Sequence, residues 1–168
     1  MAYWVRKVTR SKWPEEVLPV ESMPADVISS ELRTQKNTLS FWRIETLDEL
    51  EKAALALSVS SKSTSIETID MVYISEEEIT NSQIAVECSP GDTVIPDLAG
   101  LHRDLCALNY RTLGVVSSII NHNMKQNHAK RFTKKQVKEF LKKAYAENRV
   151  CPDICNANIY NEIAQPAV

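Results

Sequence analysis

Glycine is scarce in this sequence: only three of the 168 residues are glycine, at positions 91, 100 and 114. Glycine-rich loops that hold a phosphate need several residues without a side chain, because the backbone must approach the phosphate at positive φ. Three widely spaced glycines cannot form such a loop. The sequence therefore excludes a Walker-type phosphate loop and a dinucleotide-binding fingerprint.

Long apolar runs are also lacking. No segment reaches the roughly 18 consecutive apolar residues that a membrane-spanning helix needs. The first ten residues, MAYWVRKVTR, carry charges where a secretory signal would be apolar. We therefore expect a cytoplasmic protein with no membrane association.

Cysteine is present, but its spacing is not typical of a disulfide or zinc framework. The cysteines are at positions 88, 106, 151 and 155, and in a reducing compartment we expect them to be thiols. A conceivable Cys2His2 set comprises His122, His128, Cys151 and Cys155. Its spacing matches no recognised zinc motif, so we expect no metal site and no cofactor.

The overall composition is that of a folded protein, with 43% apolar and 25% charged residues. A chain of this length buries about two-thirds of the surface that it exposes when unfolded, which is enough for a core without metals or disulfides. We predict one domain over residues 1–168. It comprises a sheet-rich acidic part (1–95), a two-helix basic part (96–150) and a C-terminal tail (151–168).

The net charge of −2 conceals an uneven distribution. Residues 1–100 hold 9 Lys and Arg against 17 Asp and Glu, a net charge of −8. Residues 101–168 hold 11 Lys and Arg against 5 Asp and Glu, a net charge of +6. This asymmetry indicates either a charged partner or two parts that neutralise each other within one fold.

Hydrophobic periodicity predicts an α+β fold: a small, mostly antiparallel sheet of three to four strands backed by helices, with a helical C-terminal part. The predicted strands are 3–10, 38–44, 66–74 and 84–87, and the predicted helices are 25–33, 47–57, 97–124 and 133–149. Strand 38–44 has bulky apolar groups on both faces, which predicts a central position. The tail 153–168 fits a short helix or a strand.

Three capping-box patterns indicate where helical segments begin. They start at Thr46, Ser75 and Thr133, and each is followed three residues later by Glu or Gln. In a capping box the first side chain accepts a hydrogen bond from the amide three residues on, and the Glu or Gln reaches back to the first amide. The patterns predict helix starts at all three positions, the second of them a single turn.

Residues 102–109, HRDLCALN, match the catalytic-loop string of protein kinases letter for letter. The other kinase motifs are missing: the glycine-rich loop, the strand lysine, Asp-Phe-Gly and Ala-Pro-Glu. The string also falls inside the predicted helix 97–124, whereas a kinase needs it on a loop. We therefore expect His102, Arg103 and Asp104 to be polar surface or helix–helix groups, and we assign no catalytic residue.

A second enzymatic hypothesis rests on Ser63-Thr64-Ser65, followed by Glu76 and Glu78, with Arg33 or Arg43 upstream. The pattern resembles bacterial ADP-ribosyltransferases, in which the Arg grips the NAD phosphates, the Ser-Thr-Ser strand supports the pocket and the last Glu orients the ribose. The interval between the two motifs is short here. The alternative is a flexible serine linker followed by an acidic helix start, which the helix dipole favours.

The stretch 125–149 is strongly basic. It holds Lys125, Lys130, Arg131, Lys134, Lys135, Lys138, Lys142, Lys143 and Arg149, against Glu139 and Glu147. Three interpretations are open: the cations face solvent or the protein's own acidic half, they bind the phosphates of a nucleic acid, or they bind an acidic protein. The candidate partner-binding residues are Lys134, Lys135, Lys138 and Lys142, with Glu76, Glu77 and Glu78 as an acidic counterpart.

Four short strings resemble small uncharacterised bacterial proteins of mobile-element and phage-defence neighbourhoods. The strings are SKW at 11–13, AD at 25–26, NTLSFW at 37–42 and HRDL at 102–105. The resemblance implies a bacterial or phage context, in which immunity proteins, antitoxins and accessory subunits are common.

The uneven charge distribution and the lack of a complete catalytic motif together favour a non-catalytic module that binds another protein, and the resemblance suggests an immunity protein, antitoxin or defence-accessory protein. Nucleic-acid binding through helix 133–149 is the first alternative. An enzyme on an unrecognised scaffold is the second. The patterns leave the oligomeric state open.

Overall fold

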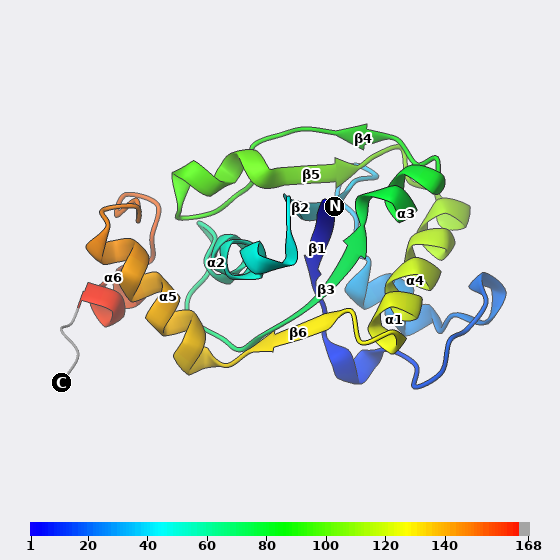
Figure 1. Ribbon diagram of the computed structural model, residues 1–168, viewed down its shortest axis with the longest axis horizontal. Coiled ribbons are helices and arrows are strands. Elements are labelled where there is room, and N and C mark those ends of the chain that lie inside the picture. Colours follow the sequence, from blue (N-terminus) through cyan, green and yellow to red (C-terminus); the bar gives the residue numbers. More distant parts are fainter. Residues whose placement is uncertain (165–168) are drawn as a thin grey trace.

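A six-stranded antiparallel sheet lies between two groups of helices in the computed structural model, which describes residues 1–164 (Figure 1). The strand order is β4-β5-β2-β1-β3-β6. The strands are β1 (Tyr3–Lys7), β2 (Leu39–Ile44), β3 (Ile69–Ser75), β4 (Val86–Glu87), β5 (His102–Leu105) and β6 (Ala129–Phe132). The helices are α1 (Ala25–Glu31), α2 (Leu50–Ser58), α3 (Glu76–Asn81), α4 (Tyr110–Lys125), α5 (Lys134–Ala146) and α6 (Ala157–Ala164). Short 3-10 helices are η1 (Arg10–Lys12), η2 (Val20–Ser22), η3 (Leu47–Glu49) and η4 (Pro96–Leu101).

Strand β2 is covered on both faces, as its sequence predicts. Side chains alternate along a strand, so Trp42 and Ile44 point to one face, while Leu39 and Phe41 point to the other. All four are buried. Because β2 pairs with β1 on one side and β5 on the other, the predicted central position is confirmed.

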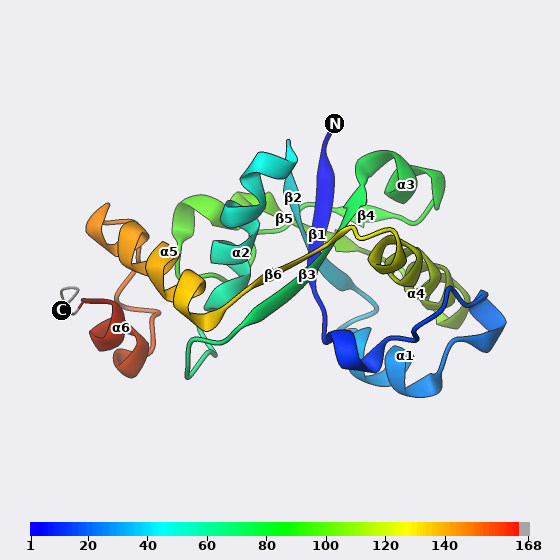
Figure 2. The same cartoon turned by 60° about the horizontal axis from the view of Figure 1, so that its bottom comes forward.

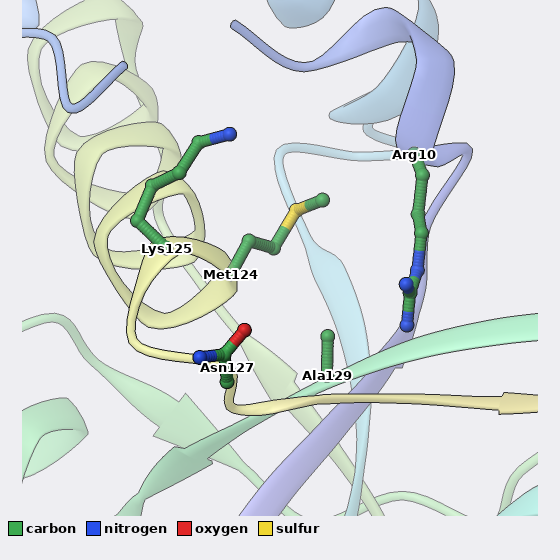
Figure 3. A pocket seen from close by; sticks show the side chains of 5 residues that line it. All are labelled: Arg10, Met124, Lys125, Asn127 and Ala129. Carbon is green, nitrogen blue, oxygen red and sulfur yellow. The ribbon is translucent and has the colours of Figure 1, made fainter. Parts of the chain in front are cut away.

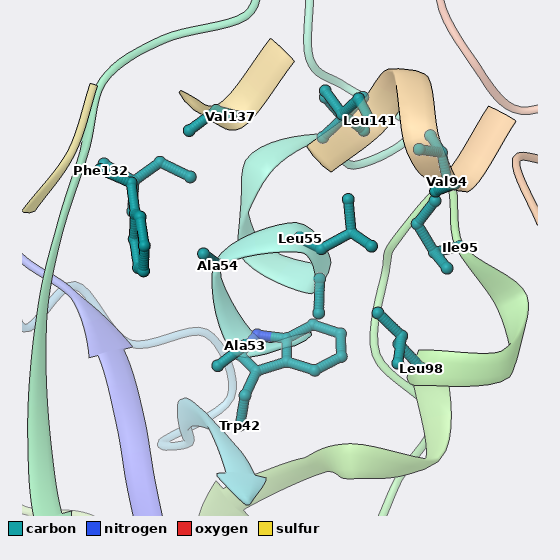
Figure 4. Close-up of a cluster of buried hydrophobic side chains, with 14 of the residues drawn as sticks. Trp42, Ala53, Ala54, Leu55, Val94, Ile95, Leu98, Phe132, Val137 and Leu141 are labelled. Atoms are coloured by element: carbon teal, nitrogen blue, oxygen red, sulfur yellow. The ribbon is translucent and has the colours of Figure 1, made fainter. Parts of the chain in front are cut away.

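The first core lies between the sheet and helices α2 and α5, with α6 packed outside α5 (Figure 1). Small residues of α2, Ala53 and Ala54, lie close to Trp42 and let the helix approach the sheet (Figure 4). Phe132 of β6 and Leu141 of α5 belong to the same buried cluster. Through these two residues, β6 and α5 are held against the core that contains Trp42 and α2.

The second core lies on the opposite face of the sheet, under α1 and α4 (Figure 2). Leu39 and Phe41 of β2 meet Leu105 of β5 and Ile120 of α4 there. Burial of a large apolar side chain contributes about 1.5–3 kcal/mol. The two cores therefore stabilise one sheet from both sides and fix the positions of its edges.

The sheet is larger than predicted, with six strands within residues 1–164 where three to four were expected. The stretch His102–Leu105 was predicted to be helical but forms β5. Residues four apart, such as Leu101 and Leu105, share a face in a helix and in a strand alike. Helix α4 begins only at Tyr110, where the Asn109 side chain accepts from the amides of the first turn.

Strand β6 was not predicted at all, and its four residues AKRF show no clear alternation. It exists because it pairs with β3 along Ile69–Val72, far away in sequence. The tail, for which the sequence allowed a helix or a strand, forms α6, and residues 165–168 lie outside the described part. Within residues 1–164 no helix is long and apolar enough to cross a membrane.

Only one of the three predicted capping boxes forms completely. At Thr133 the side chain accepts from the Gln136 amide, and Gln136 accepts from the Thr133 amide. At Ser75 the first half forms, while the Glu78 carboxylate binds elsewhere. At Thr46 the predicted helical start is confirmed, because η3 begins at Leu47 and runs directly into α2, but the capping box is wrong, since the Thr46 side chain makes no capping bond.

Candidate functional site

The C-terminal half of the basic stretch is neutralised within the protein. Lys138 Nζ of α5 lies 3.0 Å from Glu162 Oε1 of α6. Arg149 Nη2 donates to Asp97 Oδ2 at 2.8 Å. Lys142 is not free either. Two of the predicted partner-binding residues, Lys138 and Lys142, therefore already have partners inside the fold.

Apart from Lys143, which lies on α5 away from the sheet edge, the remaining cations gather around β6, and we call this surface the basic edge. It comprises Arg10, Lys125, Lys130, Arg131, Lys134 and Lys135, all of them exposed. The side chains of Lys125, Lys134 and Lys135 make no hydrogen bond or ion pair within residues 1–164. The Lys130 ammonium lies 5.8 Å from the centroid of the Phe132 ring, a cation–π contact that leaves it facing water. The basic edge therefore presents positive charge that the described fold does not neutralise.

Strand β6 is the open edge of the sheet, because it pairs with β3 alone. The Tyr73 amide donates to the His128 carbonyl at 3.0 Å, which makes these two a hydrogen-bonded pair. Such pairs alternate along an antiparallel ladder, so Lys130 also directs its backbone groups to β3. Ala129 and Arg131 therefore point their amides and carbonyls out of the sheet. No described group meets these two N–H and two C=O groups.

A single carboxylate holds the two arginines of the basic edge. Arg10 Nε lies 3.0 Å and Arg131 Nε 3.7 Å from the same Asp70 oxygen, Oδ1, and the Asp70 side chain is 14% exposed. Both contacts are ion pairs and neither is a hydrogen bond, and the terminal Nη groups of both guanidiniums have no hydrogen-bond partner within residues 1–164. The arrangement orients donors outward instead of cancelling them.

The acidic group at the start of α3 is mostly used inside the protein. Arg43 Nε donates to Glu76 Oε1 at 2.6 Å, and its guanidinium holds the pKa of Glu76 below the ordinary value. Glu78 Oε2 accepts from the Asn123 amide at 2.8 Å. Only Glu77 is exposed without a partner in the described part of the chain.

The residues of the ADP-ribosyltransferase-like pattern are not assembled in the way that family's roles require. Arg43 is bound to Glu76 and not directed at an open site. The segment Ser63–Ser65 lies in the loop between α2 and β3, not on a strand.

His102, Arg103 and Asp104 lie on β5, with Arg103 on the opposite face from the other two. Asp104 accepts from Ser40 Oγ at 3.0 Å and from Ser89 Oγ at 2.8 Å. His102 Nδ1 lies 3.0 Å from the Ser89 carbonyl oxygen. A carbonyl can only accept, so Nδ1 carries a proton and cannot take one from the serine. The network joins β2, β5 and the segment after β4, and its geometry is not that of a nucleophile and its base.

All four cysteines are free thiols. Burial raises the pKa of the Cys106 and Cys155 thiols, which lowers their thiolate fraction at neutral pH. In the part of the chain that the structure describes, no group of three or more His, Cys, Asp or Glu is arranged to hold a metal ion.

Sequence reasoning found part of the basic edge and missed the rest. Lys134 and Lys135 were candidates, and both belong to it. Lys130 and Arg131 were seen only as part of a basic stretch, because β6 was not recognised as a strand. Arg10 could not be recognised from the sequence. It lies more than 100 residues before the other cations of the basic edge, and only the pairing of β1 with β3 brings it close to them.

Comparisons of the chain with protein-family models, with curated proteins and with solved structures find no match. The function must therefore be argued from the geometry of the site.

Proposed function

We propose that this protein is a non-catalytic interaction module that binds an acidic, extended segment of a partner protein along β6. The carrying observation is the combination at one edge: outward-pointing backbone groups of Ala129 and Arg131 among six cations, of which only the two arginines have an acidic partner, and they share it. An extended peptide that joins such an edge gains backbone hydrogen bonds, and its side chains gain charge-assisted contacts.

The charge of the edge selects the partner. If β6 of one copy paired with β6 of another, Lys130 and Arg131 would face like charges, which destabilises cross-strand pairs. Lysines on edge strands prevent self-association for this reason. The acidic side chains of an added strand are instead attracted to Lys130 on one face of the sheet and to Arg131 on the other, because these two residues point to opposite faces.

The biological role that we propose is that of a bacterial immunity protein, antitoxin or defence-accessory subunit acting in the cytoplasm. Its support is the resemblance of the strings at 11–13, 25–26, 37–42 and 102–105 to proteins of such neighbourhoods. A module of this kind acts by occupying its partner, so it needs no catalytic group of its own.

The direct test uses a synthetic peptide of Glu alternating with Val, titrated into isotope-labelled protein and followed by NMR and amide hydrogen exchange. We expect the amides of Ala129 and Arg131 to become protected as the peptide binds. The double reversal Lys130→Glu with Arg131→Glu should weaken binding at least about 30-fold, since it replaces two attractions by two repulsions.

The matched control is Arg33→Glu with Lys36→Glu, which changes the net charge equally. Both residues are exposed, have no described partner and lie just before β2, which β1 and β3 separate from β6. This control should keep nearly full affinity. Equal losses in the two double variants, or binding without protection at Ala129 and Arg131, would contradict strand addition at β6.

Single-stranded nucleic acid is the second candidate, supported by an aromatic pair beside the edge, in which Tyr73 is half-buried and His128 is exposed. The rings of Tyr73 and His128 stack with centroids 5.3 Å apart and planes at 24°. Alternation places His128 on the same face as Lys130, so a base could stack where a phosphate meets the lysine.

An oligonucleotide titration at several salt concentrations distinguishes the two candidates. For nucleic acid, log affinity should fall with log salt by about 0.7 per phosphate contacted, and Tyr73→Ala should weaken binding. No binding at low salt would exclude this candidate and leave the acidic peptide.

A further inference from the structure

A small pocket opens at the beginning of β6, between the last turn of α4 and η1 (Figure 3). Its volume is about 200 Å³, and its lining comprises Arg10, Met124, Lys125, Asn127 and Ala129. Ala129 forms the floor, with Arg10 on one side and the end of α4 on the other. The pocket is large enough for a compact polar group and too small for a folded segment.

Hydrogen-bond donors without partners border this pocket (Figure 3). The ammonium of Lys125 and the side-chain amide of Asn127 make no hydrogen bond within residues 1–164. Arg10 turns its Nε to Asp70 at 3.0 Å, so its two Nη groups stay available as a fork. None of the five lining residues supplies a carboxylate. The site is therefore rich in donors and poor in acceptors.

The charge balance selects the ligand. Arg10 and Lys125 line the pocket, and Arg131 lies beside it through Asp70, so three positive charges are near and Asp70 removes one. The C-terminal end of α4 contributes about half a negative charge. An excess of about one and a half positive charges remains. A phosphoryl group carries about −1.5 to −2 at neutral pH and offers three acceptor oxygens, whereas a carboxylate carries only one negative charge.

We propose that this pocket binds a phosphoryl group. Arg10 takes two of its oxygens through the Nη fork, while Lys125 and Asn127 take the third. Met124 and Ala129 contact the carbon group that bears the phosphate. Asp70 is a positioning residue, because it fixes the arginines without touching the ligand. This inference goes beyond strand addition at β6 and does not depend on it, since Lys130 and Arg131 provide the contacts of the added strand.

The test titrates inorganic phosphate into labelled protein at constant ionic strength, with chloride as the balancing anion. We expect saturable NMR shifts at the Asn127 side-chain amide, the Ala129 amide and Arg10 Nε, with a dissociation constant on the order of 1 mM. Arg10→Ala and Lys125→Ala should each weaken binding about tenfold. Both side chains are exposed, so both variants should stay folded.

The control is Lys135→Ala, which removes a cation of the basic edge outside the pocket and should leave phosphate binding unchanged. Acetate should bind about tenfold more weakly than phosphate. O-phosphoserine and adenosine 5′-monophosphate then distinguish a phosphorylated side chain from a nucleotide as the source, because the source that fits should bind more tightly than inorganic phosphate.

Two results would overturn the proposal. One is the absence of saturable shifts up to about 50 mM phosphate, which is far above the expected constant. The other is an equal loss of phosphate binding in Lys135→Ala and Lys125→Ala, because it would mean diffuse attraction to the basic edge. Either result leaves strand addition at β6 intact, because its variants are different and its readout is protection of the Ala129 and Arg131 amides from hydrogen exchange, not a chemical-shift change.

Discussion

The two edges of the sheet treat their polar groups in opposite ways. At the β4–β5 edge, Asp104 accepts from Ser40 and Ser89, and the Cys106 amide donates to the Ala85 carbonyl at 2.7 Å. At the β6 edge, backbone groups point outward, four lysines lack acidic partners and two arginines share one carboxylate. Polar groups that satisfy one another hold a fold together, whereas convergent unsatisfied groups at a surface are available to a ligand. Changes at the first edge should therefore alter stability, and changes at the second should alter binding.

The largest effect on stability is expected from Gly91→Ala. A Cβ at Gly91 would lie 2.4 Å from Trp42 Cη2 and 2.8 Å from His102 Cβ, both in buried residues that have little room to move. Overpacking of this kind costs about 2–3 kcal/mol in the free energy of unfolding, measurable by urea denaturation. Gly100→Ala is the control, because its Cβ would meet nothing within 4 Å. Equal free energies of unfolding for the two variants would contradict the expectation that changes at the β4–β5 edge alter stability.

The next effect is expected from Asp104→Ala, which removes the shared acceptor of two serine hydroxyls. The Asp104 side chain is 14% exposed and Ser89 is half-buried, whereas Ser40 is exposed and regains water, so the loss should be about 1 kcal/mol. Asp104→Asn keeps one acceptor oxygen and should lose less. Peptide binding at β6 should be unchanged in both variants. Weakened binding would show that the two edges are coupled.

The surroundings of Gly91 and Asp104 also show what the sequence could predict. The strand that contains Trp42 was correctly predicted to be central, because it has bulky apolar side chains on both faces. His102 and Asp104 were misplaced on a helix, since a four-residue spacing of leucines fits both periodicities. Their true roles depend on Ser40 and Ser89, which only strand pairing brings near.

The candidate site was predictable to a smaller degree. Lys134 and Lys135 follow a capping box, so their position at a helix start was readable from local sequence. That Lys138 is neutralised and Lys134 is not depends on Glu162 of α6, a tertiary contact. Edge strands such as β6 carry a weak pattern, because one side of their backbone meets no neighbour.

A smaller, pH-dependent effect is expected at Glu76, whose internal pairing with Arg43 can be titrated. Its pKa is lowered in the folded state by the Arg43 guanidinium. Stability from this pair is therefore present above the unfolded-state pKa of about 4.3 and is lost as pH falls through the lower folded-state pKa. Glu76→Gln should cost less than about 1 kcal/mol at pH 7, because the carboxylate is 39% exposed and screened by water.

The measurement is the free energy of unfolding of both proteins between pH 7 and pH 3. The difference between them should shrink as the solution is acidified. A constant difference over this range would mean that Glu76 acts through packing and not through its charge.

The smallest effects are expected at the start of α5, and there the sign matters more than the size. Lys134 and Lys135 stand in the first turn of the helix, where no acidic residue accompanies them. Positive charge is unfavourable at this end of the helix dipole by a few tenths of a kcal/mol. Lys134→Ala and Lys135→Ala should therefore raise the free energy of unfolding slightly at low salt, and salt should abolish the gain.

The control Lys138→Ala should instead lower the free energy of unfolding, because it breaks the contact with Glu162. If the first two variants also weaken binding of the acidic peptide, these lysines serve the partner at the expense of the fold; if they destabilise the protein, the basic edge is a structural element and the contrast between the two edges disappears.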